Sequence, residues 1–283
     1  MRPLNRVGTS IAGLFCLLSL WVGHPSGAQA GGTIVGTVTY KGQAQEEEFA
    51  SSKSPNADFC ATLAKSKPDL FKNGGEIRLL RIIDVRADGA LKDAIASVRD
   101  IADESFTAGF RGTEIMIEQC EFRPYTSIVV DKRNLHIVNL DPTNHAIGQT
   151  VMHNPHGMEV AGPASRTLFN IALAEKRSQL NRSVSLKHLT QSSALKLVCD
   201  QHPYMQSWLL PVTNAYYATS TGDGRFEIRD VPAGKHTLKV WHPHTGSLDL
   251  TSWSLRTEPC VLTSSCRSSS AARLGSPSRA GVA

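Results

Sequence analysis

The sequence contains few aromatic residues and no cluster of positive charge. Aromatic residues make up 6% of its 283 residues, charged residues make up 19%, and the formal net charge is +5. Proteins that bind nucleic acid usually carry a dense patch of Lys and Arg, so nucleic acid is not expected as a partner. Beyond its N-terminal segment, the sequence also lacks an apolar run long enough for a membrane helix. We therefore expect no membrane span.

Several common catalytic motifs are missing as well. The sequence contains no Gly-x-Ser-x-Gly, no His-Glu-x-x-His and no phosphate-binding loop. These absences argue against the common serine hydrolases, zinc peptidases and nucleotide-binding enzymes. We therefore expect a protein that is not an enzyme.

The N-terminus has the organisation of a secretory signal peptide. Arg2 and Arg6 precede an apolar run over residues 11–22, and Ala28-Gln29-Ala30 matches the small residues of a cleavage site. This pattern predicts a signal peptide over residues 1–30 that is cleaved after Ala30. The mature protein is then expected in the periplasm or secreted, where disulfides persist.

The cysteine count indicates a thiol with a special role. The sequence has six cysteines, and an odd number remains once Cys16 leaves with the signal peptide. An odd count in an exported chain indicates one thiol outside the disulfides, and Cys199 is the candidate because of the motif around it. We expect Cys60 and Cys120 to form a disulfide, because both precede that motif and would tie the N-terminal region to the next domain. The alternative is two separate buried thiols.

Short stretches of alternating apolar residues indicate an all-β protein. The stretches 33–40 and 135–140 have this period of two and end at turn residues, whereas long helical periods are scarce. The class expected is a β-sandwich. Residues 77–85 and 90–98 flank Asp88-Gly89, which predicts a hairpin.

The motif that carries chemistry follows an apolar strand. Cys199, His202 and Met205 recur at every third position in a short loop. A mononuclear blue-copper centre uses a thiolate, two imidazoles and a weak axial thioether, whereas hard cations require oxygen ligands. The motif therefore predicts a site for one copper ion. The alternative is that Cys199 is a buried thiol and Met205 fills the core.

The second histidine of such a site must come from elsewhere in the chain. His153 is the first candidate because Asn154 follows it, and a neighbouring Asn can fix a ligand loop through hydrogen bonds. His145 competes, because it lies closer to the end of the strand 135–140. At this stage His153, His145 and, less strongly, His156 stay open.

The motif resembles the copper signature of cupredoxins, and in particular the short ligand loop of amicyanin. The resemblance implies that the equatorial ligands are His153, Cys199 and His202. It implies that the axial ligand is Met205, and that His156 is a second histidine that does not bind copper. It also implies a Greek-key sandwich over residues 113–213 and electron transfer with a redox partner protein in the periplasm. The wider sequence is similar to exported methylamine-utilisation-like proteins. Copper delivery and a metal-free β interaction module are the alternative functions.

The flanking sequence resembles a carboxypeptidase-regulatory-like β module, on the turns around Gly222, Gly224 and Pro232. Residues 31–112 and 214–246 would be its two parts, with the copper domain inserted between them. The Ser/Arg-rich residues 247–283 are expected to form a disordered or aberrant tail, and a frameshift near Gly246 is one hypothesis for it.

Three further histidines lie close together in the sequence, namely His236, His242 and His244. Their spacing matches no defined metal site, and we expect them at the surface.

Overall fold

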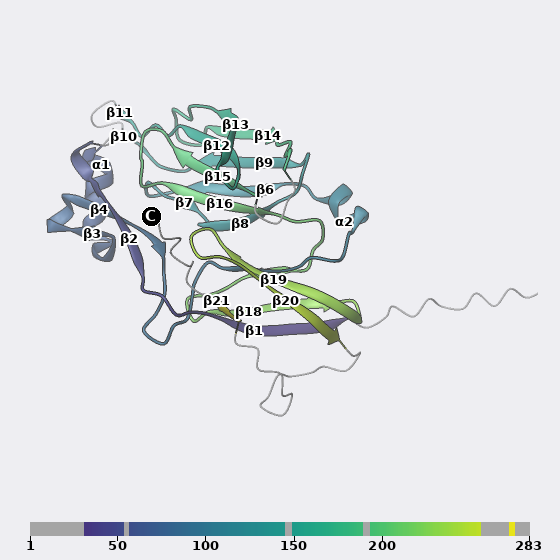
Figure 1. Cartoon of the computed structure of the whole chain (residues 1–283). Helices are drawn as coiled ribbons and strands as arrows, with labels where there is room; N and C mark the ends of the chain where they lie inside the picture. The colour runs from purple at the N-terminus through teal and green to yellow at the C-terminus, as the bar shows by residue number, and fades with distance from the viewer. Residues whose placement is uncertain (1–30, 54–56, 145–148, 189–192, 256–271, 275–283) are drawn as a thin grey trace, which may run out of the picture.

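The computed structural model describes residues 31–53, 57–144, 149–188, 193–255 and 272–274. The predicted signal peptide lies outside these residues. Strands dominate in the described ranges, and the α-helices there are the short α1 (Ala57–Thr62) and α2 (Glu104–Gly109). The all-β prediction is therefore confirmed. Figure 1 shows one β unit above another, with an arm along their side.

The upper unit consists of two facing sheets, and we call it the site sandwich. One sheet has the strand order β13 (Ala164–Asn170), β12 (Pro155–Ala161), β15 (Ser193–Cys199), β16 (Gln206–Pro211) and β8 (Thr126–Val129). The other has the order β14 (Gln179–Ser183), β9 (Asn134–Asn139), β6 (Thr113–Ile117) and β7 (Phe122–Arg123). The pairs β16–β8 and β6–β9 are parallel, and the other neighbours in these two sheets are antiparallel.

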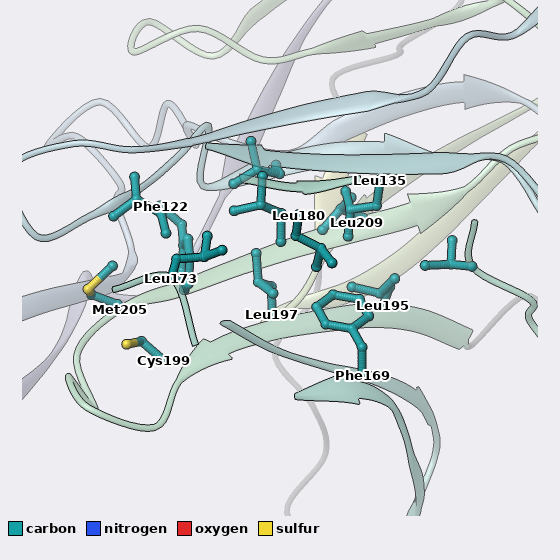
Figure 2. Close-up of a cluster of buried hydrophobic side chains, with 14 of the residues drawn as sticks. Phe122, Leu135, Phe169, Leu173, Leu180, Leu195, Leu197, Cys199, Met205 and Leu209 are labelled. Atoms are coloured by element: carbon teal, nitrogen blue, oxygen red, sulfur yellow. The ribbon is translucent and has the colours of Figure 1, made fainter. Parts of the chain in front are cut away.

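Alternation along β15 places the thiol of the sequence motif. Because successive side chains of a strand point to opposite faces, Leu195, Leu197 and Cys199 share the inward face and are all buried. Figure 2 shows the three side chains in line along this strand. Burial of each leucine contributes roughly 1.5–3 kcal/mol to stability. The apolar strand thus holds Cys199 at the end of a well-anchored core.

The lower unit, which we call the β module, is built from two distant parts of the chain. One sheet contains β18 (Arg225–Val231), β1 (Gly32–Tyr40) and β21 (Ala272–Leu274). The other contains β17 (Tyr217–Thr219), β5 (Ile95–Val98), β19 (Gly234–His242) and β20 (Gly246–Leu255). The chain leaves this module after β5 and returns at β17. The resemblance to a carboxypeptidase-regulatory-like module stays a prediction.

Residues 45–83 form the arm, and they differ from their predicted place in the β module. β4 (Ile77–Ile83) pairs with β2 (Gln45–Ala50) and β3 (Phe71–Lys72). Short 3-10 turns complete the arm, namely η1 (Ser51–Lys53), η2 (Leu63–Lys65), η3 (Pro68–Leu70) and η4 (Asn73–Gly75). Apolar side chains of the arm pack against the core of the site sandwich, among them Phe49, Leu63 and Leu80. The arm therefore belongs spatially to the site.

The predicted hairpin around Asp88-Gly89 forms only its turn. The Gly89 N–H donates to the Arg86 carbonyl at 2.8 Å, and a single bridge joins Val85 to Leu91. The two strands that flank this turn do not pair with each other: β4 belongs to the sheet of the arm, and β5 belongs to a sheet of the β module. A period of two shows which side chains face a core, but it does not specify the neighbouring strand.

Part of the predicted tail over residues 247–283 forms a strand, β20 (Gly246–Leu255). β20 pairs with β19 from Gly246 onward, and Leu248 and Leu250 pack against the core of the β module. Because side chains alternate along a strand, these two leucines share the face directed at this core. Residues 256–271 and 275–283 lie outside the described residues. Within the described ranges, no helix has the length and apolarity needed to cross a membrane.

The two units meet at a cluster that the sequence did not predict. His242 at the end of β19 is 1% exposed, so its predicted surface position is wrong. The His244 Nε2 lies 2.9 Å from the Tyr125 hydroxyl, and its ring lies 5.5 Å from the Trp208 ring. Both histidines lie in this junction because β19 ends at His242, next to the site sandwich (Figure 1). Burial lowers the pKa of His242 to about 3, and the charge of His244 adds to the effect.

This junction predicts a loss of stability in mild acid. Burial, together with the charge of Lys196, also lowers the pKa of His244, to about 4. A histidine in the unfolded chain titrates near 6.5. Below that pH the unfolded state therefore takes up protons first, and the free energy of unfolding should fall from about pH 6.5 towards pH 4. Urea unfolding measured across this range checks the prediction.

The control for this prediction is His136→Asn, which removes a histidine from β9. His242→Asn keeps an acceptor near the Nδ1 position but does not titrate, so its stability should depend less steeply on pH than that of the wild type. Equal slopes for His242→Asn and His136→Asn would show that the junction does not set the acid response.

Candidate metal centre

The loop between β15 and β16 brings the motif residues to one side. The His202 N–H donates to the Cys199 carbonyl at 3.2 Å, and the Met205 N–H donates to the His202 carbonyl at 2.9 Å. The Cys199 N–H closes the loop by donating to the Met205 carbonyl at 3.3 Å. The first two bonds join residues three apart, as in successive tight turns, and the third joins residues six apart across the loop. They explain why side chains at every third position gather at the same end of the core.

Three nitrogen and sulfur donors converge there. Cys199 Sγ lies 3.6 Å from His202 Nδ1 and 4.0 Å from His153 Nδ1. One donor atom from each of the three residues lies within 4.8 Å of the others. The exposed fraction is 0% for both histidines and 2% for Cys199. These three side chains therefore form one buried donor set.

The spacing of these donors fits a single metal ion. For metal–sulfur and metal–nitrogen bonds of about 2.3 and 2.0 Å, donors on one ion lie roughly 3.5–3.8 Å apart. The two distances from Cys199 Sγ, 3.6 and 4.0 Å, lie at or near this range. A thiolate with two imidazoles is also a donor set suited to copper. The residues present therefore fit the predicted ion.

Met205 and the competing histidines take different positions. Met205 is 1% exposed, and Figure 2 shows it with Cys199 at the same end of the core, next to Phe122 and Leu173. His156 lies at the rim, where its ring nitrogens face Asp200 at 3.2 Å and Thr167 at 2.9 Å. His145 lies outside the described residues. The structure thus brings His153 to the donor set.

The thiol of Cys199 is poorly suited to act as a free nucleophile. Burial raises its pKa, although a hydrogen bond from the Asn154 N–H, with an N···S distance of 3.3 Å, acts in the opposite direction. Reactive cysteines are usually partly exposed and have a lowered pKa. Among the described cysteines, Cys199 is the free one. Its surroundings therefore suit a ligand, because a bound cation would stabilise the thiolate.

The arm covers the side of the site that carries His202. The Tyr204 ring contacts the His202 ring with centroids 5.8 Å apart. On the Tyr204 ring lie the guanidinium of Arg78 at 5.2 Å and the ring of Phe49 at 6.1 Å. Arg78 is itself held by an ion pair with Glu121 at 2.5 Å. Sequence patterns did not reveal this cover, because it joins segments that are distant in the chain.

The predicted disulfide fastens this cover. Cys60 in α1 is bonded to Cys120 in the turn between β6 and β7, with Cα atoms 6.2 Å apart. Both sulfurs lie within 4.8 Å of a ring nitrogen of His202. The cross-link therefore joins the arm to the site sandwich directly beside the donor set.

Removal of this cross-link should lower stability by up to about 4 kcal/mol. The disulfide closes a loop with a sequence separation of 60 residues, and the loss of loop-closure entropy in the unfolded chain gives this magnitude. Urea unfolding of the Cys60→Ala/Cys120→Ala double variant, compared with wild type, measures it. An unchanged midpoint and slope would mean that the arm contributes no such constraint.

Comparisons with known proteins give limited similarity. No family model matches the chain, and no curated protein matches it. A copper-containing nitrite reductase from Thermus scotoductus is 13% identical with a TM-score of 0.27, over 36% of this chain and 23% of that one. A methionine-to-alanine mutant of amicyanin in the Cu(I) form is 14% identical with a TM-score of 0.26, over 41% and 98%. A purple cupredoxin from Nitrosopumilus maritimus is 14% identical with a TM-score of 0.26, over 35% and 99%. These matches identify no family for the chain.

Proposed function

We propose that this chain is an exported protein that binds one copper ion and transfers electrons to or from a redox partner protein in the periplasm. The observation that supports this proposal best is the convergence of His153, Cys199 and His202 in one buried donor set. Met205 lies at the same end of the core, and its thioether would supply a weak additional donor to the ion. Bound copper would supply a one-electron redox couple at this position.

The donor types favour copper over other metals. Thiolate and thioether sulfur select soft ions such as copper, whereas magnesium and calcium require oxygen ligands. One carboxylate, that of Asp141, contacts His153 but is directed at the far nitrogen of the ring. The donor set of His153, Cys199 and His202 therefore offers nitrogen and sulfur atoms, and no carboxylate oxygen, to the ion.

Burial of the donors supports electron transfer over copper delivery. Delivery requires the ion to leave, and an exchangeable site normally has an open side. Here His153 and His202 are 0% exposed, and Cys199 is anchored at the end of a core strand. A rigid site lowers the rearrangement needed on a change of charge, which suits a centre that keeps its ion.

The Cys199→Ser variant tests the metal site. Wild-type mature protein loaded with Cu(II) should show an intense visible thiolate-to-copper band, which Cys199→Ser should lose because the band requires the sulfur. His156→Gln serves as the control and should keep the band, since His156 lies at the rim. Visible absorption and electron paramagnetic resonance measure both. A colourless wild type with a spectrum of nitrogen and oxygen ligands would refute the proposal.

The Met205→Leu variant tests the axial position. Leucine has a similar volume, so a core exchange of this kind usually costs less than about 1.5 kcal/mol. The variant should keep copper but have a higher reduction potential, because the thioether donates electron density that stabilises Cu(II). Met116→Leu, at a position that is 46% exposed, is the matched control and should leave the potential unchanged. Complete loss of copper in Met205→Leu would assign Met205 a different role.

A further inference from the structure

Asp141 is a buried carboxylate whose hydrogen bonds lead to the donor set. Its side chain is 2% exposed, and Oδ2 lies 2.8 Å from His153 Nε2. The backbone N–H of Cys120 donates to Oδ2 at 2.9 Å, and the N–H of Gln119 donates to Oδ1. Burial of a carboxylate is unfavourable unless its charge is matched by close donors. Three groups lie within hydrogen-bonding distance of this carboxylate, namely the N–H groups of Gln119 and Cys120 and the Nε2 of His153.

The donors from the backbone come from a strained turn. Gln119 and Cys120 have φ values of +56° and +54°, in the left-handed region that costs residues with a Cβ about 1–2 kcal/mol each. Glu118 and Glu121 exchange backbone hydrogen bonds of 3.0 and 3.1 Å on either side. This is a two-residue hairpin turn that usually carries glycine or asparagine. Successive amides in such a turn can point at one anion, and here they hold Asp141.

The carboxylate determines which nitrogen of His153 is free. A neutral imidazole carries one N–H and one acceptor nitrogen. An ionised carboxylate only accepts hydrogen bonds, so Nε2 carries the hydrogen and donates to Asp141. The lone pair of Nδ1 is then directed to the side of Cys199 Sγ, 4.0 Å away. A metal ion requires that lone pair.

We propose that Asp141 is a positioning residue of the copper centre. It holds His153 as the Nε2–H tautomer, and its negative charge makes the imidazole a stronger donor and favours Cu(II) over Cu(I). Hydrogen bonds from histidine ligands to carboxylates have this effect in other metal sites. This inference rests on the proposed function. A purely structural role, in which Asp141 only stabilises the turn, would affect folding but neither the tautomer nor the potential.

The test compares Asp141→Asn with Glu159→Gln. Glu159 is also a 2% exposed carboxylate of the site sandwich, and it accepts from the Arg166 guanidinium at 2.6 Å and from the His188 N–H at 2.6 Å. Its loss removes a comparable buried charge at a position outside the donor set. Both variants are therefore expected to be less stable, and only Asp141→Asn should alter the centre.

Two measurements are needed, one of which requires no metal. In the metal-free protein, ¹⁵N resonances of the imidazole rings report the tautomer, with His153→Gln to assign the signals. Wild type and Glu159→Gln should show His153 with its hydrogen on Nε2, and Asp141→Asn should lose this preference. In the copper-loaded protein, Asp141→Asn should bind Cu(II) roughly 10–100-fold more weakly, with a smaller change for Cu(I). Each tenfold difference raises the reduction potential by about 59 mV.

The outcomes separate this inference from the proposed function. A wild-type protein with His153 protonated on Nδ1 would overturn the inference even if Asp141→Asn fails to fold. A wild-type tautomer and potential in Asp141→Asn would overturn it as well. If the wild type gives no thiolate-to-copper band, the proposed function fails, whereas the tautomer of the metal-free protein still reports whether Asp141 orients His153.

Discussion

The burial of three polar donors at the end of an apolar core is the constraint on which the rest of the structure depends. His153, Cys199 and His202 have almost no access to water, and polar groups removed from water are destabilising unless they are hydrogen-bonded. Neighbouring groups form the hydrogen bonds that these donors need: the Asn154 N–H faces the sulfur of Cys199, and the Asp141 carboxylate faces His153. Each of these hydrogen bonds restrains a further segment of the chain. The donor set thus determines the conformation of the loops around it.

A series of contacts connects Asp141 to the arm. To stabilise this carboxylate, the turn at Gln119 and Cys120 adopts a backbone conformation that is unfavourable for both residues. Cys120 is also bonded to Cys60 of the arm, and the arm covers Tyr204 and His202. A strained turn, a disulfide and a covered histidine are therefore parts of one arrangement. Residues 113–213 alone would keep Tyr204 but would lack Phe49 and Arg78, which lie on its ring.

Local features of the site could be predicted from the sequence, and features that depend on distant segments could not. The spacing of Cys199, His202 and Met205 places them in one loop, because tight turns and strand alternation act over a few residues. Asp141 directly follows the predicted strand 135–140, but its role could not be predicted, since its contacts with His153 and Cys120 arise from tertiary structure. His242 was placed at the surface for a similar reason, because a sequence pattern does not show where two units meet.

The donor set has two unlike sides, and the difference bears on what the site can do. On the side of His202, the rings of Tyr204 and Phe49 and the guanidinium of Arg78 form a cover that the disulfide fastens. On the side of Cys199, a polar rim is formed by hydrogen bonds that converge on Asp200, among them those of His156 and Asn170. An ion could leave through the first side only if the arm moved, and through the second only if this rim opened. An electron requires neither movement, because it needs only proximity to a partner at the rim. The same walls that would slow the release of an ion leave electron transfer possible, and this supports the proposed role in electron transfer over copper delivery.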